Sequence, residues 1–128
     1  MSTILLPYMT EPAFHFPDTL QVNDEFKWVA SYDGEIVGYA GTLAVLGTGA
    51  GTSVDVQLVN DDTGVTYFST QPTFEVNSAT KVLEGGELID SPTFRQGETL
   101  RAYITAISTA PKDGIFRIIC KLRKPVTV

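Results

Sequence analysis

The chain has 128 residues, a length that suits one compact domain with its own apolar core. Hydrophobic residues make up 43% of it and charged residues 19%, which excludes disorder of the whole chain, and the net charge of −6 disfavours a nucleic-acid partner. Cys120 is the only cysteine and His15 the only histidine, so an internal disulfide and most metal or general-base schemes are excluded too.

The sequence also lacks the usual membrane and export signals. No apolar run approaches the roughly 20 residues that a membrane helix needs. The N-terminus has two prolines and no basic region, so it does not resemble a secretory signal. We therefore expect synthesis in the cytoplasm and no membrane partner.

The first 25 residues combine regularly spaced prolines with apolar side chains. Pro7, Pro12 and Pro17 keep the backbone extended, and the apolar side chains between them need burial on the same chain or on a neighbouring subunit. We expect an extended N-terminal arm over residues 1–25 and a β-sandwich domain over residues 26–128. The arm residues expected to bind a partner are Ile4, Leu5, Leu6, Tyr8, Phe14, His15 and Phe16.

Alternating apolar and polar residues predict strands through the first half of the domain. Strands are expected over residues 26–32, 35–46 and 54–60, although the first of these also fits helical spacing. Residues 60–64, Asn-Asp-Asp-Thr-Gly, have the composition of a tight turn. They predict a hairpin between residues 54–60 and 65–68.

The second half is dominated by β-branched residues. Residues 99–109 match both helical and strand spacing, and their Ile and Thr residues favour a strand. Residues 111–114, Pro-Lys-Asp-Gly, predict a turn in which glycine supplies a positive φ. The closing strand, residues 116–123, follows it. With shorter pieces near residues 73–76 and within 81–94, about eight strands form an all-β, antiparallel two-sheet sandwich of jelly-roll or Greek-key kind.

Candidate catalytic and ligand-binding motifs are weak. The glycine-rich residues 47–52 lead into a strand and lack the lysine of a phosphate loop. Asp61 and Asp62, with Asp33 or Glu35, lack the alternating ligand pattern of a calcium loop. The scattered carboxylates leave a glycosidase-type pair open, but nothing in the sequence favours one. We expect no enzymatic activity, no metal and no cofactor.

Basic residues are concentrated near the C-terminus. Lys27 is the only Lys or Arg in residues 1–80, whereas alternation in the last strand places Arg117, Lys121 and Arg123 on one face. These cations either pair with the protein's own acids or meet an acidic partner surface. We include this basic face among the predicted partner-binding residues.

The order of these pieces resembles that of small β-sandwich virion proteins of tailed bacteriophages, in particular the capsid decoration, or cement, proteins. The resemblance covers residues 26–124. Its motifs are turn and strand-entry sequences that many β-sandwiches share. They are Tyr32-Asp33-Gly34-Glu35-Ile36, the small-residue loop 47–52, the strand 54–60 with its turn, Phe94-Arg95-Gln96-Gly97-Glu98-Thr99-Leu100, and the turn Lys112-Asp113-Gly114 before the closing strand.

The resemblance implies a non-enzymatic protein on the capsid surface of a virion. Its expected partner is the major capsid protein of a phage shell, which it would bind as a homotrimer and stabilise. The alternative is a carbohydrate-binding or adhesion module of a phage tail or head fibre, with Trp28 or Tyr39 as an exposed platform for a sugar.

Overall fold

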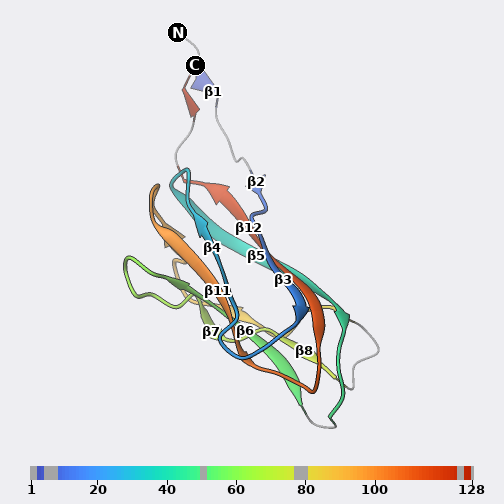
Figure 1. Cartoon of the computed structure of the whole chain (residues 1–128). Helices are drawn as coiled ribbons and strands as arrows, with labels where there is room; N and C mark the ends of the chain where they lie inside the picture. The colour runs from blue at the N-terminus through green and yellow to red at the C-terminus, as the bar shows by residue number, and fades with distance from the viewer. Residues whose placement is uncertain (1–2, 5–8, 50–51, 77–80, 124–125, 128) are drawn as a thin grey trace.

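The computed structural model describes residues 3–4, 9–49, 52–76, 81–123 and 126–127. It confirms the antiparallel two-sheet sandwich (Figure 1). One sheet, called the β5–β12 sheet, contains β10 (Thr93–Phe94), β5 (Gly34–Val45) and β12 (Lys112–Leu122) in that order, and both β2 (Met9–Thr10) and β3 (Ala13–Thr19) lie along the other side of β12. The second, called the β6–β11 sheet, has the order β4 (Glu25–Val29), β11 (Thr99–Ala106), β6 (Ser53–Asn60) and β8 (Thr73–Glu75).

Two short strand pairs complete the described part of the chain. β7 (Phe68–Thr70) pairs with β9 (Glu87–Leu88). β1 (Thr3–Ile4) pairs with β13 (Val126–Thr127), and in Figure 1 this pair lies beyond the ends of the two sheets. The described segments nearest the two chain ends therefore run side by side.

The core lies between the two sheets because each long strand turns alternate side chains inward. In β12 the buried side chains are Phe116, Ile118 and Cys120. In β11 Leu100, Ala102 and Ile104 are buried, which confirms the strand prediction for a segment that also fits a helix. Other core residues of the two sheets are Phe14, Phe16, Ile36, Leu43, Phe94, Val54, Val56, Leu58 and Phe74.

The expected separation of an arm over residues 1–25 from the sandwich is wrong in its boundary. β3 is a strand of the β5–β12 sheet, with Phe16 opposite Gly114 and Phe14 opposite Phe116. The side chain of Phe14 is 0% exposed. Residues 13–19 follow a strand period and bury their apolar row in the protein's own core, so residues 25 and 26 mark no domain boundary.

The turn predictions have mixed outcomes. The hairpin around residues 60–64 is confirmed, because the Asn60 amide donates to the Val65 carbonyl at 2.8 Å. The turn predicted over residues 111–114 is wrong in its placement, because Lys112–Gly114 already belong to β12 and the bend lies at residue 110, where the chain passes from β11 of one sheet to β12 of the other. The positive φ belongs to Ala110 and Asp113 instead of Gly114. Asp113 is an extra residue at a β-bulge, where the register of β12 shifts.

Candidate protein-binding surface

The outer surface of the β5–β12 sheet, called the outer face below, carries half-buried aliphatic side chains of β12. Ile115 and Ile119 of β12 alternate with the buried row and therefore point outward. The neighbouring positions of β5 are small, with Ala40 opposite Arg117 and Gly38 opposite Ile119. The long side chains of β12 therefore lie beside a row of small residues along β5, which is called the strip below.

A segment outside the named strands closes the far side of this strip. The Leu83 amide donates to the Gly41 carbonyl at 3.0 Å, and the isolated bridge between Thr42 and Val82 aligns residues 81–83 with β5. Gly41 permits this close approach, since a Cβ there would lie 3.0 Å from the Leu83 side chain. Val82 consequently stands at the side of β5, with 49% of its surface exposed.

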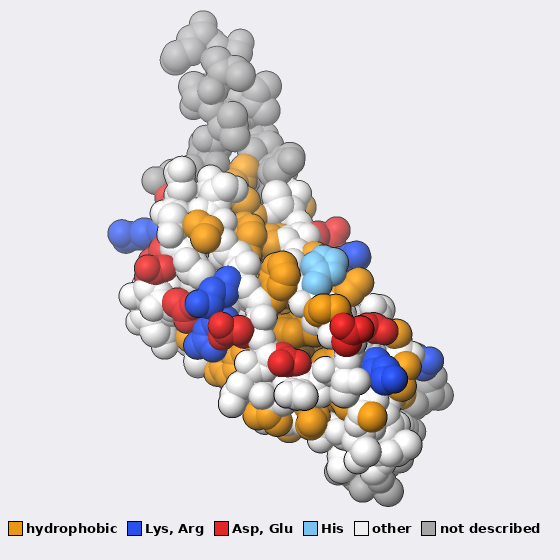
Figure 2. Space-filling model, in the orientation of Figure 1, with side chains coloured by type: hydrophobic (Ala, Val, Ile, Leu, Met, Phe, Trp, Pro, Cys, Tyr) orange, Lys and Arg blue, Asp and Glu red, His pale blue; other side chains and the backbone are white. Residues whose placement is uncertain are grey.

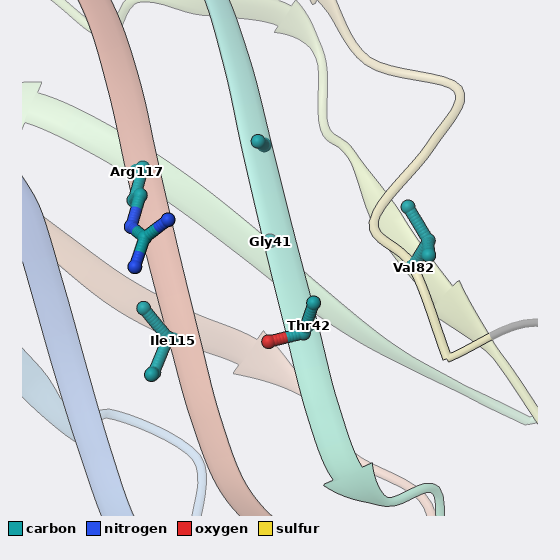
Figure 3. Close-up of a pocket in the computed structure, with 6 residues that line it drawn as sticks. Gly41, Thr42, Val82, Ile115 and Arg117 are labelled. Atoms are coloured by element: carbon teal, nitrogen blue, oxygen red, sulfur yellow. The ribbon is translucent and has the colours of Figure 1, made fainter. Parts of the chain in front are cut away.

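The strip contains a pocket of about 180 Å³ (Figure 3). In Figure 3 the hydroxyl of Thr42 points from β5 toward β12, and the guanidinium of Arg117 lies along β12 on the side of Ile115. The pocket thus joins an apolar wall to two groups that can donate hydrogen bonds. Its lining residues are Ala40, Gly41, Thr42, Val82, Ile115 and Arg117.

The three predicted residues of the basic face have different surroundings. Arg117 is exposed beside the pocket, and no carboxylate of the described residues lies within 4.0 Å of its guanidinium. The ammonium of Lys121, by contrast, lies 3.8 Å from the Glu35 carboxylate, which neutralises it locally. Arg123 follows the end of β12 and is exposed, and its amide donates to the Asp33 carbonyl.

The predicted arm residues are separated by the fold. Phe14 and Phe16 are core residues, so the expectation that they bind a partner is wrong for this conformation. His15, between them, points outward, with its ring centroid 5.8 Å from that of Phe26. Ile4 belongs to β1 and pairs with Val126. Leu5, Leu6 and Tyr8 lie outside the described residues.

The opposite surface, outside the β6–β11 sheet, carries ion pairs beside the exposed Val29. Arg101 lies 3.0 Å from the Asp61 carboxylate and 3.2 Å from that of Glu25, and it stacks over the ring of Tyr103. Lys27 approaches both acids at 4.0 Å. In Figure 2 acidic and basic side chains lie close together over β4 and β11. This surface therefore balances its own charges.

The acidic residues considered for calcium already have protein partners. The Asp62 carboxylate accepts from the Thr99 amide at 2.7 Å, and the Asp33 carboxylate accepts from the Gln96 amide at 2.9 Å. Within the part of the chain that the structure describes, no three His, Cys, Asp or Glu side chains are grouped as metal ligands. Turn and strand geometry accounts for these acids.

The aromatic residues considered as a sugar platform pack against the core. The Trp28 ring meets Phe94 edge to face at 5.4 Å, and the Tyr39 ring meets Phe68 at 5.4 Å. The Tyr39 hydroxyl also accepts from the Gly86 amide at 2.7 Å. Both residues are only partly exposed, so neither presents a free ring face of the kind that stacks on a sugar.

Cys120 is a buried thiol, and burial raises its pKa to about 12, with a small opposing effect from a hydrogen bond to Tyr32. We expect iodoacetamide at pH 8 to leave Cys120 unmodified in the folded protein and to alkylate it after denaturation, as measured by mass spectrometry. Because the folded pKa is raised, the unfolded chain loses this proton first. The thiol's contribution to stability should therefore fall as pH rises above about 9. Rapid alkylation of the folded protein would contradict this burial.

Two antiparallel sheets packed around one core place the chain in the structural class of β-sandwich proteins. Comparison with protein-family models and with curated proteins gives no match. Among solved structures, a chain in the acidic stable capsid structure of Helicobacter pylori bacteriophage KHP30 is similar with a TM-score of 0.58 and 13% identity. The likeness covers 99% of this chain and 97% of that one.

A second similar chain comes from the capsid asymmetric unit of cyanophage Pam1. Its TM-score is 0.57 at 11% identity, and the likeness covers 90% of this chain and 84% of that one. At such low identity the likeness establishes the fold, including the strands that precede residue 26. It does not assign roles to individual residues.

Proposed function

We propose that this protein is a non-enzymatic structural component of a virion that binds the outside of a phage capsid and stabilises it. The observation that carries the proposal is the likeness to a chain of a phage capsid structure along 99% of this chain and 97% of the other. The second similar chain also comes from a phage capsid. A fold shared over its whole length supports a shared structural use more strongly than one shared motif.

The surfaces of the molecule agree with a role in binding. The outer face carries half-buried aliphatic side chains of β12 and the exposed Val82, whereas the opposite surface carries neutralised ion pairs. A protein that binds only the assembled shell stabilises it by mass action, by about 2.7 kcal/mol at a hundredfold excess over Kd. Attachment as a homotrimer would strengthen weak contacts through effective concentration.

We assign the shell contacts to the N-terminal segment and to the basic face. The segment contributes Ile4, Leu5, Leu6 and Tyr8, and His15 stands exposed on β3. Arg117, Lys121 and Arg123 contribute the basic face, with Lys121 already paired to Glu35. The partner is the major capsid protein, and the protein is located on the capsid surface after synthesis in the host cytoplasm. Among the described residues no helix is long and apolar enough to cross a membrane.

The proposal is tested with capsid shells assembled without this chain. The added protein should cosediment with the shells to saturation and raise the temperature at which they disassemble. Bovine serum albumin at the same concentration is the control for protein that is trapped nonspecifically in the shell pellet. Purified protein that leaves both sedimentation and disassembly temperature unchanged would contradict the proposal.

The contribution of the N-terminal segment requires a shorter truncation than the whole of residues 1–25, since β3 belongs to the sandwich. Removing residues 1–8 leaves β2 and β3 in place. We expect the truncated protein to bind shells at least tenfold more weakly while its unfolding remains cooperative. Equal binding by the truncated and full-length chains would remove the segment from the interface.

A further inference from the structure

Arg117 is the cation beside the pocket, and the described part of the fold does not balance its charge. Lys81, Arg95, Lys112 and Arg123 likewise have no carboxylate within 4.0 Å among the described residues, but none of them lines the pocket. Arg101, Lys27 and Lys121 each lie within 4.0 Å of a carboxylate. Arg117 has no such neighbour among the described residues, although it stands in the middle of β12, opposite Ala40. A guanidinium without a carboxylate of its own can pair with a carboxylate brought by another molecule, because its planar group donates two parallel hydrogen bonds to the two oxygens.

The pocket beside Arg117 adds a second requirement. Ile115, Val82 and Ala40 supply apolar walls, and the volume of about 180 Å³ admits a single aliphatic side chain. Thr42 turns its hydroxyl toward the same space, as Figure 3 shows. A ligand that satisfies both parts must join an acidic group to an aliphatic group within a few ångströms. Neighbouring residues of a polypeptide do this.

We infer that the pocket over β5 and β12 binds a segment of a partner protein in which an aspartate or glutamate lies next to an aliphatic residue. Arg117 pairs with the carboxylate, and the aliphatic side chain enters between Ile115 and Val82. The inference rests on the proposed function, and it identifies the chemistry that the shell protein must present to this face. The short side chain of Ala40 leaves room over β5 for the approaching backbone.

Two substitutions test the two halves of the contact separately. Arg117→Glu reverses the charge, and Ala40→Leu fills the pocket without changing any charge. Both residues are exposed, so both variants should unfold at the same denaturant concentration as the wild type. Lys112→Glu is the matched control, because it makes the same charge change at an exposed position of the same strand, away from the pocket lining.

The measurement is cosedimentation of each protein with shells assembled without this chain, at low and at physiological salt. We expect Arg117→Glu and Ala40→Leu to bind at least tenfold more weakly than the wild type, Arg117→Lys to recover part of the loss, and Lys112→Glu to bind within twofold. Salt should weaken the wild type more than Arg117→Glu.

The outcomes separate this inference from the proposed function. Wild-type protein that binds shells while either Arg117→Glu or Ala40→Leu binds within twofold of it would overturn the pocket contact and leave the virion role standing. Wild-type protein that does not bind shells would overturn the virion role, and the inferred contact with it.

Discussion

Replacement of Phe14 by alanine is expected to lower the free energy of unfolding by about 3–5 kcal/mol. The side chain is 0% exposed, and its ring lies 5.5 Å from that of Phe116 and 6.3 Å from that of Phe26. Removing it would leave a cavity at the centre of the sandwich, where β3 and β12 pair. The measurement is urea unfolding monitored by the fluorescence of the single tryptophan, Trp28.

The neighbouring residue provides the control. His15 lies on the same strand but points to the exposed side, so His15→Ala should cost less than about 1 kcal/mol. If Phe14→Ala were as mild as His15→Ala, residues 13–19 would be a dispensable arm and not a strand of the sandwich.

Asn60→Ala should be the second severe substitution, with a loss of about 2–4 kcal/mol. The Asn60 side chain is buried at the start of the 60–64 turn. Its Nδ2 donates to the Tyr67 hydroxyl at 3.0 Å and to the Glu98 carboxylate at 3.1 Å. Its Oδ1 accepts from the amides of Asp62 and Thr63. Alanine would leave these groups without the partners that hold the hairpin to the neighbouring strands.

A double-mutant cycle isolates the contact with Tyr67. The Tyr67 hydroxyl also donates to the Thr93 carbonyl at 2.9 Å, so Tyr67→Phe has a cost of its own. Asn60→Ala and Tyr67→Phe should be coupled by about 1 kcal/mol, measured by urea unfolding. The exposed Thr63→Ala serves as the control in the same turn. If the two losses of unfolding free energy were simply additive, the hydrogen bond between Asn60 and Tyr67 would make no contribution to stability.

The long strands could be predicted because local alternation reflects burial on one side. Phe116, Ile118 and Cys120 repeat with period two, and so do Leu100, Ala102 and Ile104, and both rows lie in the core. The turn after Asn60 could be predicted for the same reason, because it is indicated by the residue types of the turn itself. These features depend on residues that are close together in the sequence, so the sequence alone is sufficient to predict them.

Pairing between distant segments could not be predicted in the same way. Phe14 and Phe16 alternate around His15 and so already carried a strand pattern, but nothing local indicates that their partner is β12. The bulge at Asp113 depends on the register of three strands. Positive φ therefore falls on an aspartate, where composition favoured Gly114.

The candidate surface was predicted only in part. Alternation correctly placed Arg117 and Lys121 outward, but Ile115 and Ile119 belong to the same outward row and were not considered as contact residues. The available signal is that both are apolar residues in the outward row of β12. Val82 carried no signal, because its place beside β5 depends on the close approach of residues 81–83 to Gly41.

The most direct measurement of the central claim is cryo-electron microscopy of purified particles of the phage to which the proposed function assigns this chain. We predict density for the sandwich at repeated symmetry positions on the outside of the shell, with the outer face of the β5–β12 sheet against a neighbouring polypeptide. Particles of full infectivity and stability in which the chain is absent would contradict the account.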